Sequence, residues 1–481
     1  MQTGHHAQTH NRWLALIVLC FGVLMIVLDT TIVNVALPSI RADLGFSETS
    51  LVWVVNAYML TFGGFLLLGG RLGDFFGQRR LFLIGIASFT LASLICGMAA
   101  TQQQLVWARA VQGLGGAVVS AVALSLIMNL FTEQGERAKA MGVYGFVCAG
   151  GGSLGVLLGG LLTSTLSWHW IFLVNLPIGI VVYGLCLRLL PAHGAVLRPQ
   201  KLDVAGALSI TASMMLAVYA IVNGNETGWL SGETLGLFAL AGLLFAWFIR
   251  LQLRVAAPLM PLSLFRQRNV SVANVVAVLW AAALFAWFFM SALYMQFVLG
   301  YDALQVGLAF LPANVVMALF SLGLSAWLVM RIGIRASLTL GLVLAALGLG
   351  WFARAPLDGM FWLDIFPSMV LLGLGGGIAF NPLLLAAMND VAPEDSGLAS
   401  GVVNTAFMMG GAVGLAVLAS LAALVSQKWL AQGNALPSAL LAGYQLAFLL
   451  GAAAAGIGAG LALLLMHEPK STQSAASAPV H

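Results

Sequence analysis

The sequence predicts an all-α integral membrane protein, and three observations support this: the composition, a series of long apolar segments and an internal repeat. Of the 481 residues, 61% are hydrophobic and only 7% are charged. A soluble domain carries roughly 25% charged residues, so this chain has too few to cover a surface in water. The mean hydropathy of +1.01 agrees with this interpretation. We therefore expect the lipid bilayer to be its solvent.

Fourteen segments have the length and composition of transmembrane helices, which need roughly 20 apolar residues to cross a bilayer. Stretches rich in turn-forming residues, such as "NGNETGWLSGE", separate them. The first segment lacks an Ala-x-Ala-like cleavage site and many similar segments follow it, so we interpret it as a span and not as a signal peptide. The predicted spans are about 13–36, 51–70, 81–100, 105–130, 139–163, 170–190, 204–222, 235–251, 270–298, 305–328, 337–352, 363–388, 400–424 and 443–466.

The lysines and arginines indicate which side of the membrane each loop faces. With the N-terminus in the cytoplasm and the spans alternating in direction, sixteen of the 20 Lys and Arg residues fall in cytoplasmic segments. Only Arg41, Arg354 and Lys428 fall in outer loops, and Arg109 lies inside a span. This bias follows the positive-inside rule and predicts that both termini are cytoplasmic. The net charge of +4 is small, and we expect no nucleic-acid partner.

An internal repeat predicts how the spans are grouped. The stretch "MGVYGFVCAGGGSLG" (141–155) aligns with "SGVVNTAFMMGGAVG" (400–414), so that four glycines coincide. At nearly the same offset, "GRLGDFFGQRR" (70–80) aligns with "AWLVMRIGIRA" (326–336). Duplicated halves are typical of secondary transporters. We expect two six-helix bundles and two inserted central helices, arranged as a cytoplasmic N-terminus 1–12, a first bundle 13–190, the inserted helices 204–251, a second bundle 270–466 and a disordered cytoplasmic tail 467–481.

The residues that could support enzymatic or metal chemistry are scattered. The four cysteines lie singly in apolar runs, and all seven histidines fall in tails or predicted loops. The chain contains no Gly-Lys-Ser/Thr, so it has no P-loop for ATP. An intramembrane enzyme would need clustered His, Cys or carboxylate groups. We therefore expect no enzymatic activity, no metal and no cofactor.

Asp29 and Arg109 are the charged residues that most need an explanation. Asp29 is the only acid well inside a predicted span, and a charge in the bilayer costs several kcal/mol. At about 1.5 Å per residue, both residues fall in the outer halves of their helices, at similar depths. One interpretation is a static ion pair that positions two helices. The other is a proton switch, because burial and a neighbouring guanidinium have opposite effects on the proton affinity of a carboxyl group.

Four motifs resemble the major facilitator superfamily: "LDTTIVNVALP" (28–38), "GRLGDFFGQRR" (70–80), "WARAVQGLGGA" (107–117) and "WHWIFLVNLPIG" (168–179). With fourteen spans, the chain looks like a member of the drug:proton antiporter branch. The resemblance implies the major facilitator fold and proton-driven efflux of lipophilic small molecules across the bacterial inner membrane. The implied partners are the lipid bilayer, a lipophilic substrate, protons and, in a Gram-negative cell, a periplasmic adaptor protein. The proton gradient would replace any cofactor.

The sequence departs from this family pattern in two places. Val156 follows Gly155 where the antiporter branch usually has proline, and Phe75 follows Asp74 where a basic residue is usual. The first departure keeps an alternative open, in which the protein imports or exports one specific metabolite on the same fold.

Two further groups of residues are functional candidates. By resemblance, the loop around Asp74 latches the two halves together, and small residues on the fifth helix allow close, sliding contacts. The gating candidates are Gly70, Asp74, Gly77, Arg79, Arg80, Gly151, Gly155 and Gly159. Scattered polar and aromatic residues in the spans suit a wide apolar cavity for lipophilic ligands, although each could equally join two helices. These cavity candidates are Asn56, Tyr58, Gln112, Tyr144, Asn175, Trp287, Tyr294, Gln296, Asn314, Asn381, Asn404 and Met408.

Overall fold

A computed structural model describes residues 2–131, 133–190, 202–388, 391 and 395–467, and this part of the chain is helical without strands. The first bundle contains α1 (Gln2–Leu44), α2 (Trp53–Phe76), α3 (Gln78–Gly97), α4 (Gln102–Leu130), α5 (Gln134–Thr165), α6 (Trp170–Leu173) and α7 (Asn175–Leu189). The inserted helices are α8 (Val204–Thr227) and α9 (Gly232–Arg254). The second bundle contains α10 (Arg268–Leu293), α11 (Ala303–Leu319), α12 (Ser325–Phe352), α13 (Phe366–Met388), α14 (Ser396–Ala431) and α15 (Leu436–Leu465). Almost all of the tail predicted as disordered, from residue 468 on, lies outside the described residues.

The fourteen predicted crossings are confirmed. Within the described residues, twelve helices are long and apolar enough to span a membrane. The 32-residue α5 is a further crossing. The last is formed by α11, which continues through a π-helical turn (Phe320–Leu324) into the first residues of α12. Gly333, with φ of +85°, then breaks the helix and separates this crossing from the next one.

The first span extends further than predicted. We expected it to end near residue 36, whereas α1 continues through Pro38 to Leu44. Proline removes one backbone hydrogen bond from a helix. Leu37 and Ile40, on either side of Pro38, are fully buried. Packing of these two side chains therefore compensates for the missing bond.

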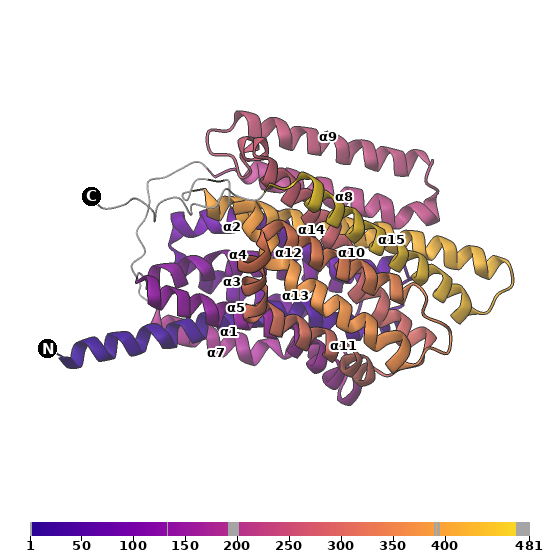
Figure 1. The fold of residues 1–481 in the computed structure, drawn as a ribbon, viewed down its shortest axis with the longest axis horizontal. Helices are drawn as coiled ribbons and strands as arrows, with labels where there is room; N and C mark the ends of the chain where they lie inside the picture. Colours follow the sequence, from indigo (N-terminus) through magenta and orange to yellow (C-terminus); the bar gives the residue numbers. More distant parts are fainter. Residues whose placement is uncertain (1, 132, 191–201, 389–390, 392–394, 468–481) are drawn as a thin grey trace.

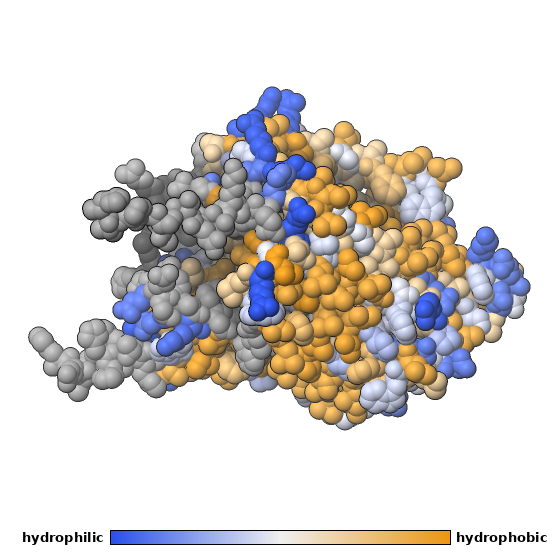
Figure 2. Space-filling model, in the orientation of Figure 1, coloured by the Kyte–Doolittle hydropathy of each residue, from blue (hydrophilic) through white to orange (hydrophobic). Residues whose placement is uncertain are grey.

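The helices lie side by side, with the inserted pair at the edge of the molecule (Figure 1). We call the end of the bundles at which α1 begins the terminal end, and the other end the opposite end. A broad apolar surface covers the middle of the face shown in Figure 2, with polar residues gathered towards its ends. On α9, large side chains such as Leu243 and Trp247 are exposed. In a bilayer such a surface faces lipid.

The sequence repeat corresponds to a repeat in helix packing. In the first bundle α1 packs on α5 and α2 on α4, and in the second bundle α10 packs on α14 and α11 on α13. The glycines that coincide in the alignment make matching contacts: Gly155 of α5 lies against Leu28 of α1, and Gly414 of α14 lies against Ala282 of α10. Gly77 and Gly333 also share the same unusual backbone conformation, with φ of +86° and +85°.

The two bundles are in close contact at the opposite end. Gly160 of α5 packs so tightly on α11 that a Cβ atom added to it would lie 2.6 Å from the carbonyl oxygen of Ala303. Nearby, Gln296 donates a hydrogen bond of 2.9 Å to the carbonyl oxygen of Val35. The guanidinium of Arg41 lies 5.0 Å from the centre of the Phe297 ring. These contacts close the opposite end in this structure.

The inserted pair bridges the two bundles. On one side, α8 packs against α2, and on the other side it packs against α14, where Asn225 donates a 2.9 Å hydrogen bond to the carbonyl oxygen of Ser420. The segment after α9 is held by α2, because the guanidinium of Arg71 donates to the carbonyl oxygens of Ala257 and Pro258. The chain between the bundles is therefore attached to the helices that it joins.

Gly160→Val should hold the two bundles apart at the opposite end, because the added side chain meets the Ala303 carbonyl group. Spin labels on Ala42→Cys and Asp358→Cys, both at exposed positions, in a variant without the native cysteines, would report the separation. We expect a shift to distances several ångströms longer. Gly236→Val on α9, where an added Cβ atom meets open space, is the control. An unchanged distance distribution in Gly160→Val would contradict this account of the closed end.

Candidate functional site

The candidate site is a buried ion pair between α1 and α4. Nη1 of Arg109 is paired with Oδ2 of Asp29. The exposed fractions of the two side chains are 1% and 0%. The prediction that similar depth would make these two residues neighbours is confirmed. An ion pair of this kind needs further hydrogen bonds to offset the cost of removing both charges from water.

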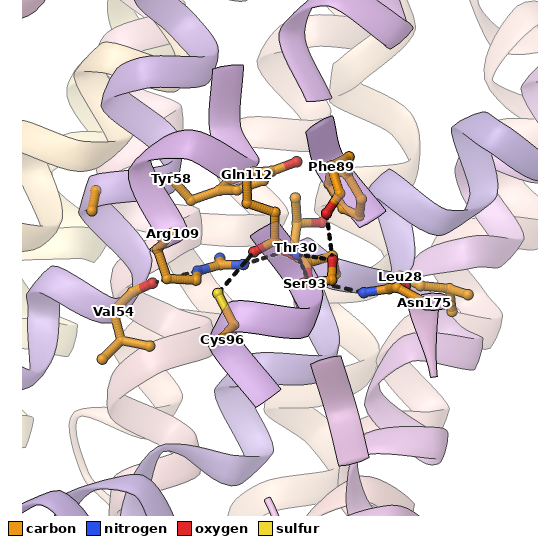
Figure 3. Close-up of polar contacts among 12 residues, drawn as sticks. Leu28, Thr30, Val54, Tyr58, Phe89, Ser93, Cys96, Arg109, Gln112 and Asn175 are labelled. Atoms are coloured by element: carbon orange, nitrogen blue, oxygen red, sulfur yellow. Dashed lines mark hydrogen bonds and ion pairs between the residues drawn. The ribbon is translucent and has the colours of Figure 1, made fainter. Parts of the chain in front are cut away.

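Neutral groups from three other helices supply these hydrogen bonds (Figure 3). Gln112, one turn after Arg109 on α4, accepts from Nη1 of Arg109 at 2.7 Å and donates to Oδ1 of Asp29 at 2.7 Å. The same Gln112 amide donates to Ser93 of α3 at 2.8 Å. Nε of Arg109 donates to the carbonyl oxygen of Val54 in α2 at 2.8 Å, and Asn175 of α7 donates more weakly to Asp29 at 3.4 Å. Four helices of the first bundle therefore meet at one carboxylate and one guanidinium, and α3 joins them through the bond between Gln112 and Ser93.

Aromatic rings enclose the guanidinium. The Cζ atom of Arg109 lies 4.5 Å from the centre of the Tyr58 ring and 5.6 Å from that of Phe172. A cation over a ring face is attracted to it, and more so without water. Within the described part of the chain, the Tyr58 hydroxyl group and Oδ1 of Asn175 are buried and have no hydrogen-bond partner. Two polar atoms beside the ion pair are thus available for a further bond.

The local sequence explains how these side chains come together. Arg109 and Gln112 are three residues apart on α4 and therefore share a face of the helix. Gly113, next along the chain, has no side chain that would keep α2 away, and the backbone of Tyr58 packs directly against it. Sequence reasoning missed Ser93 and the Val54 carbonyl group. A small polar residue in an apolar span could have marked Ser93, whereas a backbone carbonyl group leaves no signal in the sequence.

The second bundle has no such charges at the corresponding positions. Gly115 packs on Gly85 and Phe89 in the first bundle in the same way that Gly375 packs on Gly341 and Ala345 in the second. This match places buried Met369 at the position of Arg109 and buried Leu372 at that of Gln112. The match between Leu28 and Ala282 likewise places Ala283 at the position of Asp29. The polar site therefore belongs to one bundle alone.

Several cavity candidates bond to other parts of the protein, mostly to other helices, whereas Asn404 bonds within its own helix α14. Gln112, Asn175 and Tyr58 belong to the ion-pair network described above. Asn56 donates a 2.9 Å hydrogen bond to the carbonyl oxygen of Ala412 across the two bundles, as Gln296 does to Val35. The side chains of three further candidates donate to backbone carbonyl groups of their own bundle: Tyr294 to Pro356, Asn381 to Ser321 and Asn404 to Ser400.

The remaining cavity candidates are Trp287, Asn314, Met408 and Tyr144. Nε1 of Trp287 and Nδ2 of Asn314 are buried and have no hydrogen-bond partner within the described residues. Met408 packs against Gly63 of α2, and Tyr144 lies half-buried on α5. A role for any of these residues in substrate binding stays a prediction.

The gating candidates lie in two places. At the terminal end, Gly70 lies on α2, Gly77 separates α2 from α3, and Arg79 donates a 2.6 Å hydrogen bond to the carbonyl oxygen of Leu187, while Arg80 is exposed. The side chain of Asp74 lies outside the described residues. On α5, Gly151, Gly155 and Gly159 all face α1 within the same bundle, and the adjacent Gly160 faces the other bundle. The proposed gating roles themselves stay predictions.

Comparison with known proteins gives consistent matches. The family model described as "Major Facilitator Superfamily" matches residues 19–415. The cephamycin export protein CmcT of Amycolatopsis lactamdurans is 41% identical, over 87% of this chain and 86% of its own. The puromycin resistance protein pur8 of Streptomyces alboniger is 39% identical, over 90% of this chain and 86% of its own. Among solved structures, the nucleoside transporter NupG has a TM-score of 0.64 over 94% of this chain and 99% of its own, at 14% identity, which supports the fold alone.

Removal of one partner of the ion pair should destabilise the protein more than removal of both charges. Arg109→Leu leaves the Asp29 carboxylate buried without a cation, which typically costs about 3–5 kcal/mol. Asp29→Asn combined with Arg109→Leu removes that uncompensated charge and should recover part of the loss. Thermal unfolding of the purified proteins in detergent measures the difference. Met369→Leu, at the corresponding position of the second bundle, is the control, and a double variant no more stable than Arg109→Leu would argue against a charge-dependent site.

Proposed function

The chain belongs to the major facilitator superfamily, and from this premise we propose that it exchanges lipophilic small molecules for protons, with Asp29 as the group that carries the proton. It is a multi-pass membrane protein and an efflux transporter, like its relatives that are named for antibiotic export or resistance. We propose that it performs transport without chemical conversion of the substrate. The terminal end would face the cytoplasm of a bacterial cell, as the distribution of Lys and Arg residues predicts.

The observation that supports proton coupling best is the way in which Arg109 is held. Its guanidinium has contacts besides Asp29: the Val54 carbonyl oxygen, the Gln112 amide and the Tyr58 ring. When Asp29 takes up a proton and becomes neutral, Arg109 can therefore keep its position, because these neutral hydrogen-bond partners and the ring remain. The same contacts also stabilise the ionised pair, so Arg109 has hydrogen-bond partners in both protonation states of Asp29.

Asn175 provides a partner for the protonated form of Asp29. Its Nδ2 atom donates to the carboxylate, and its Oδ1 atom is buried and unpartnered. A side-chain amide can rotate to exchange donor for acceptor. After rotation, Oδ1 of Asn175 would accept a hydrogen bond from protonated Asp29. The same residue thus suits both protonation states.

Transport would follow from alternate opening of the two ends. In this structure the glycine contact between α5 and α11 closes the opposite end, so we infer that the state is one in which substrate would enter from the terminal end. Opening of the opposite end would release the substrate and expose the ion-pair region to protons. Rocking of two bundles around a site near the membrane midplane is a common mechanism in such folds.

The substrate class follows from the chemistry around the site. The corresponding positions of the second bundle are apolar, and Asp29 is the only acid well inside a predicted span, so a dication would find no second carboxylate. We propose monocationic, neutral or weakly acidic lipophilic compounds as substrates, and the names of the relatives place antibiotics among the first to test. Val156, in place of a proline, keeps transport of one specific metabolite as the second candidate.

Asp29→Asn should abolish transport driven by a proton gradient, because the amide cannot bind and release a proton. Proteoliposomes with an imposed pH gradient, tested with a panel of dyes, antibiotics and metabolites, measure accumulation. We expect the variant to fall to the level of protein-free liposomes while it still exchanges substrate without a gradient. The control is Asn404→Asp, which adds an acid elsewhere in the spans. Undiminished gradient-driven accumulation by Asp29→Asn would refute the proposal, and a response to a single compound would favour the metabolite transporter.

A further inference from the structure

A groove on the outside of the first bundle begins between α3 and α7, continues along the exposed face of α7, and is separate from the ion-pair site. It consists of two adjoining hollows of about 320 and 300 Å³, which share Ile180 of α7. The first hollow lies towards the opposite end, where Thr90 of α3 and Gly179 of α7 help to line it. The second is lined by α7 alone, and it runs along this helix towards the terminal end and finishes at Arg188. We call the two hollows together the α3–α7 groove.

The length of the groove matches the acyl chains of one leaflet. Its lining on α7 extends from Leu176 to Arg188, which is about 18 Å at 1.5 Å per residue. Half of the hydrocarbon core of a bilayer is about 15 Å thick. A phospholipid whose headgroup lies beside Arg188 could therefore place an acyl chain along most of the groove.

The walls of the groove are apolar, and Gly184 leaves open space in the second hollow. Ile86 and Leu94 of α3 and Leu176 of α7 line the first hollow. At Gly184, in the second hollow, an added Cβ atom would meet no other atom within 4 Å. The space at this position is therefore open for a chain that is not part of the protein.

Positive charge gathers at the terminal end of the groove. Arg188 lines the groove directly, and its side chain is exposed. Arg79, in the first turn of α3, donates to the carbonyl oxygen of Leu187, so its guanidinium lies beside the backbone that precedes Arg188. Nε of Arg79 is buried and has no hydrogen-bond partner within the described residues. An anion at this place would lie near two guanidinium groups, and that of Arg79 has an unpaired N–H donor.

We propose that the α3–α7 groove binds an anionic phospholipid of the leaflet at the terminal end, with an acyl chain along α7 and its phosphate group beside Arg188 and Arg79. Basic pockets between transmembrane helices are suited to anionic headgroups. A neutral lipid would fill the groove but give the arginines no net negative charge. A free phosphate ion would pair with the arginines but leave the apolar hollows empty. Only a ligand with both parts uses the whole groove.

Such a lipid would affect the ion-pair site because it contacts two helices, α3 and α7, that carry partners of the site. Ser93 of α3 and Asn175 of α7, which bond to the Asp29 network, lie on the same two helices as the groove. Leu94 and Leu176, their neighbours in the chain, line the groove itself. A bound acyl chain would therefore hold in place the two helices that carry the neutral partners of Asp29.

Native mass spectrometry of the full chain in detergent, titrated with phosphatidylglycerol or phosphatidylcholine of the same acyl chains, tests the proposal. One arginine near a headgroup contributes about 1 kcal/mol, so we expect an apparent Kd about fivefold or more lower for phosphatidylglycerol. Arg188→Gln should reduce this preference, and Gly184→Leu should weaken the binding of both lipids because it fills the second hollow. Rising salt should also reduce the preference for phosphatidylglycerol in the unaltered protein, because salt screens the attraction between the arginines and the headgroup. This test needs no variant.

Matched substitutions on α9 serve as controls. Arg254→Gln removes an exposed arginine at the end of that helix, and Gly242→Leu adds a side chain where an added Cβ atom meets open space. Both should leave the preference for phosphatidylglycerol unchanged. An equal preference in Arg188→Gln and in the unaltered protein would overturn the proposal. Complete displacement of phosphatidylglycerol by inorganic phosphate would also overturn it, because the ligand would then be the free anion.

Discussion

The absence of water in the bilayer core is the constraint on which the rest of the first bundle depends. Asp29 and Arg109 are both inaccessible to solvent, so every hydrogen bond that they make has to come from the protein. The bundle meets this need with a neutral amide on α4, a second amide on α7 and a backbone carbonyl group on α2. A hydroxyl group on α3 bonds to the α4 amide. The packing of these helices therefore also determines the hydrogen bonds of the ion pair.

Glycine makes this packing possible and also determines where the bundles touch. Gly113 brings α2 against α4 beside the ion pair, and Gly155 brings α5 against α1. Gly160, on the next face of α5, makes the contact with the second bundle. Neighbouring small residues on one helix thus serve two different interfaces, one within a bundle and one between bundles. In the proposed transport cycle, the interface between bundles is the one that opens.

The two bundles share a packing plan but differ in chemistry. The second bundle repeats the glycine contacts of the first, yet it has Ala283, Met369 and Leu372 where the first has Asp29, Arg109 and Gln112. One bundle thus holds the titratable pair, and the other provides a largely apolar wall. This division suits the exchange of a proton for a lipophilic molecule, because the two cargoes need opposite environments. The inserted α8, which contacts α2 and α14, connects the two parts at the edge of the molecule.

The sequence alone determined the number of spans, the internal repeat and the pairing of Asp29 with Arg109, because hydropathy, charge and depth can be read from the segments themselves. Only the tertiary structure decided which helix faces meet. It showed that Gly159 and Gly160 serve different interfaces, that Gln112 and Asn175 bond to Asp29, and that α1 continues beyond Pro38. The rotation and tilt of a helix are set by contacts with segments far away in the chain. No pattern within a single span records those contacts.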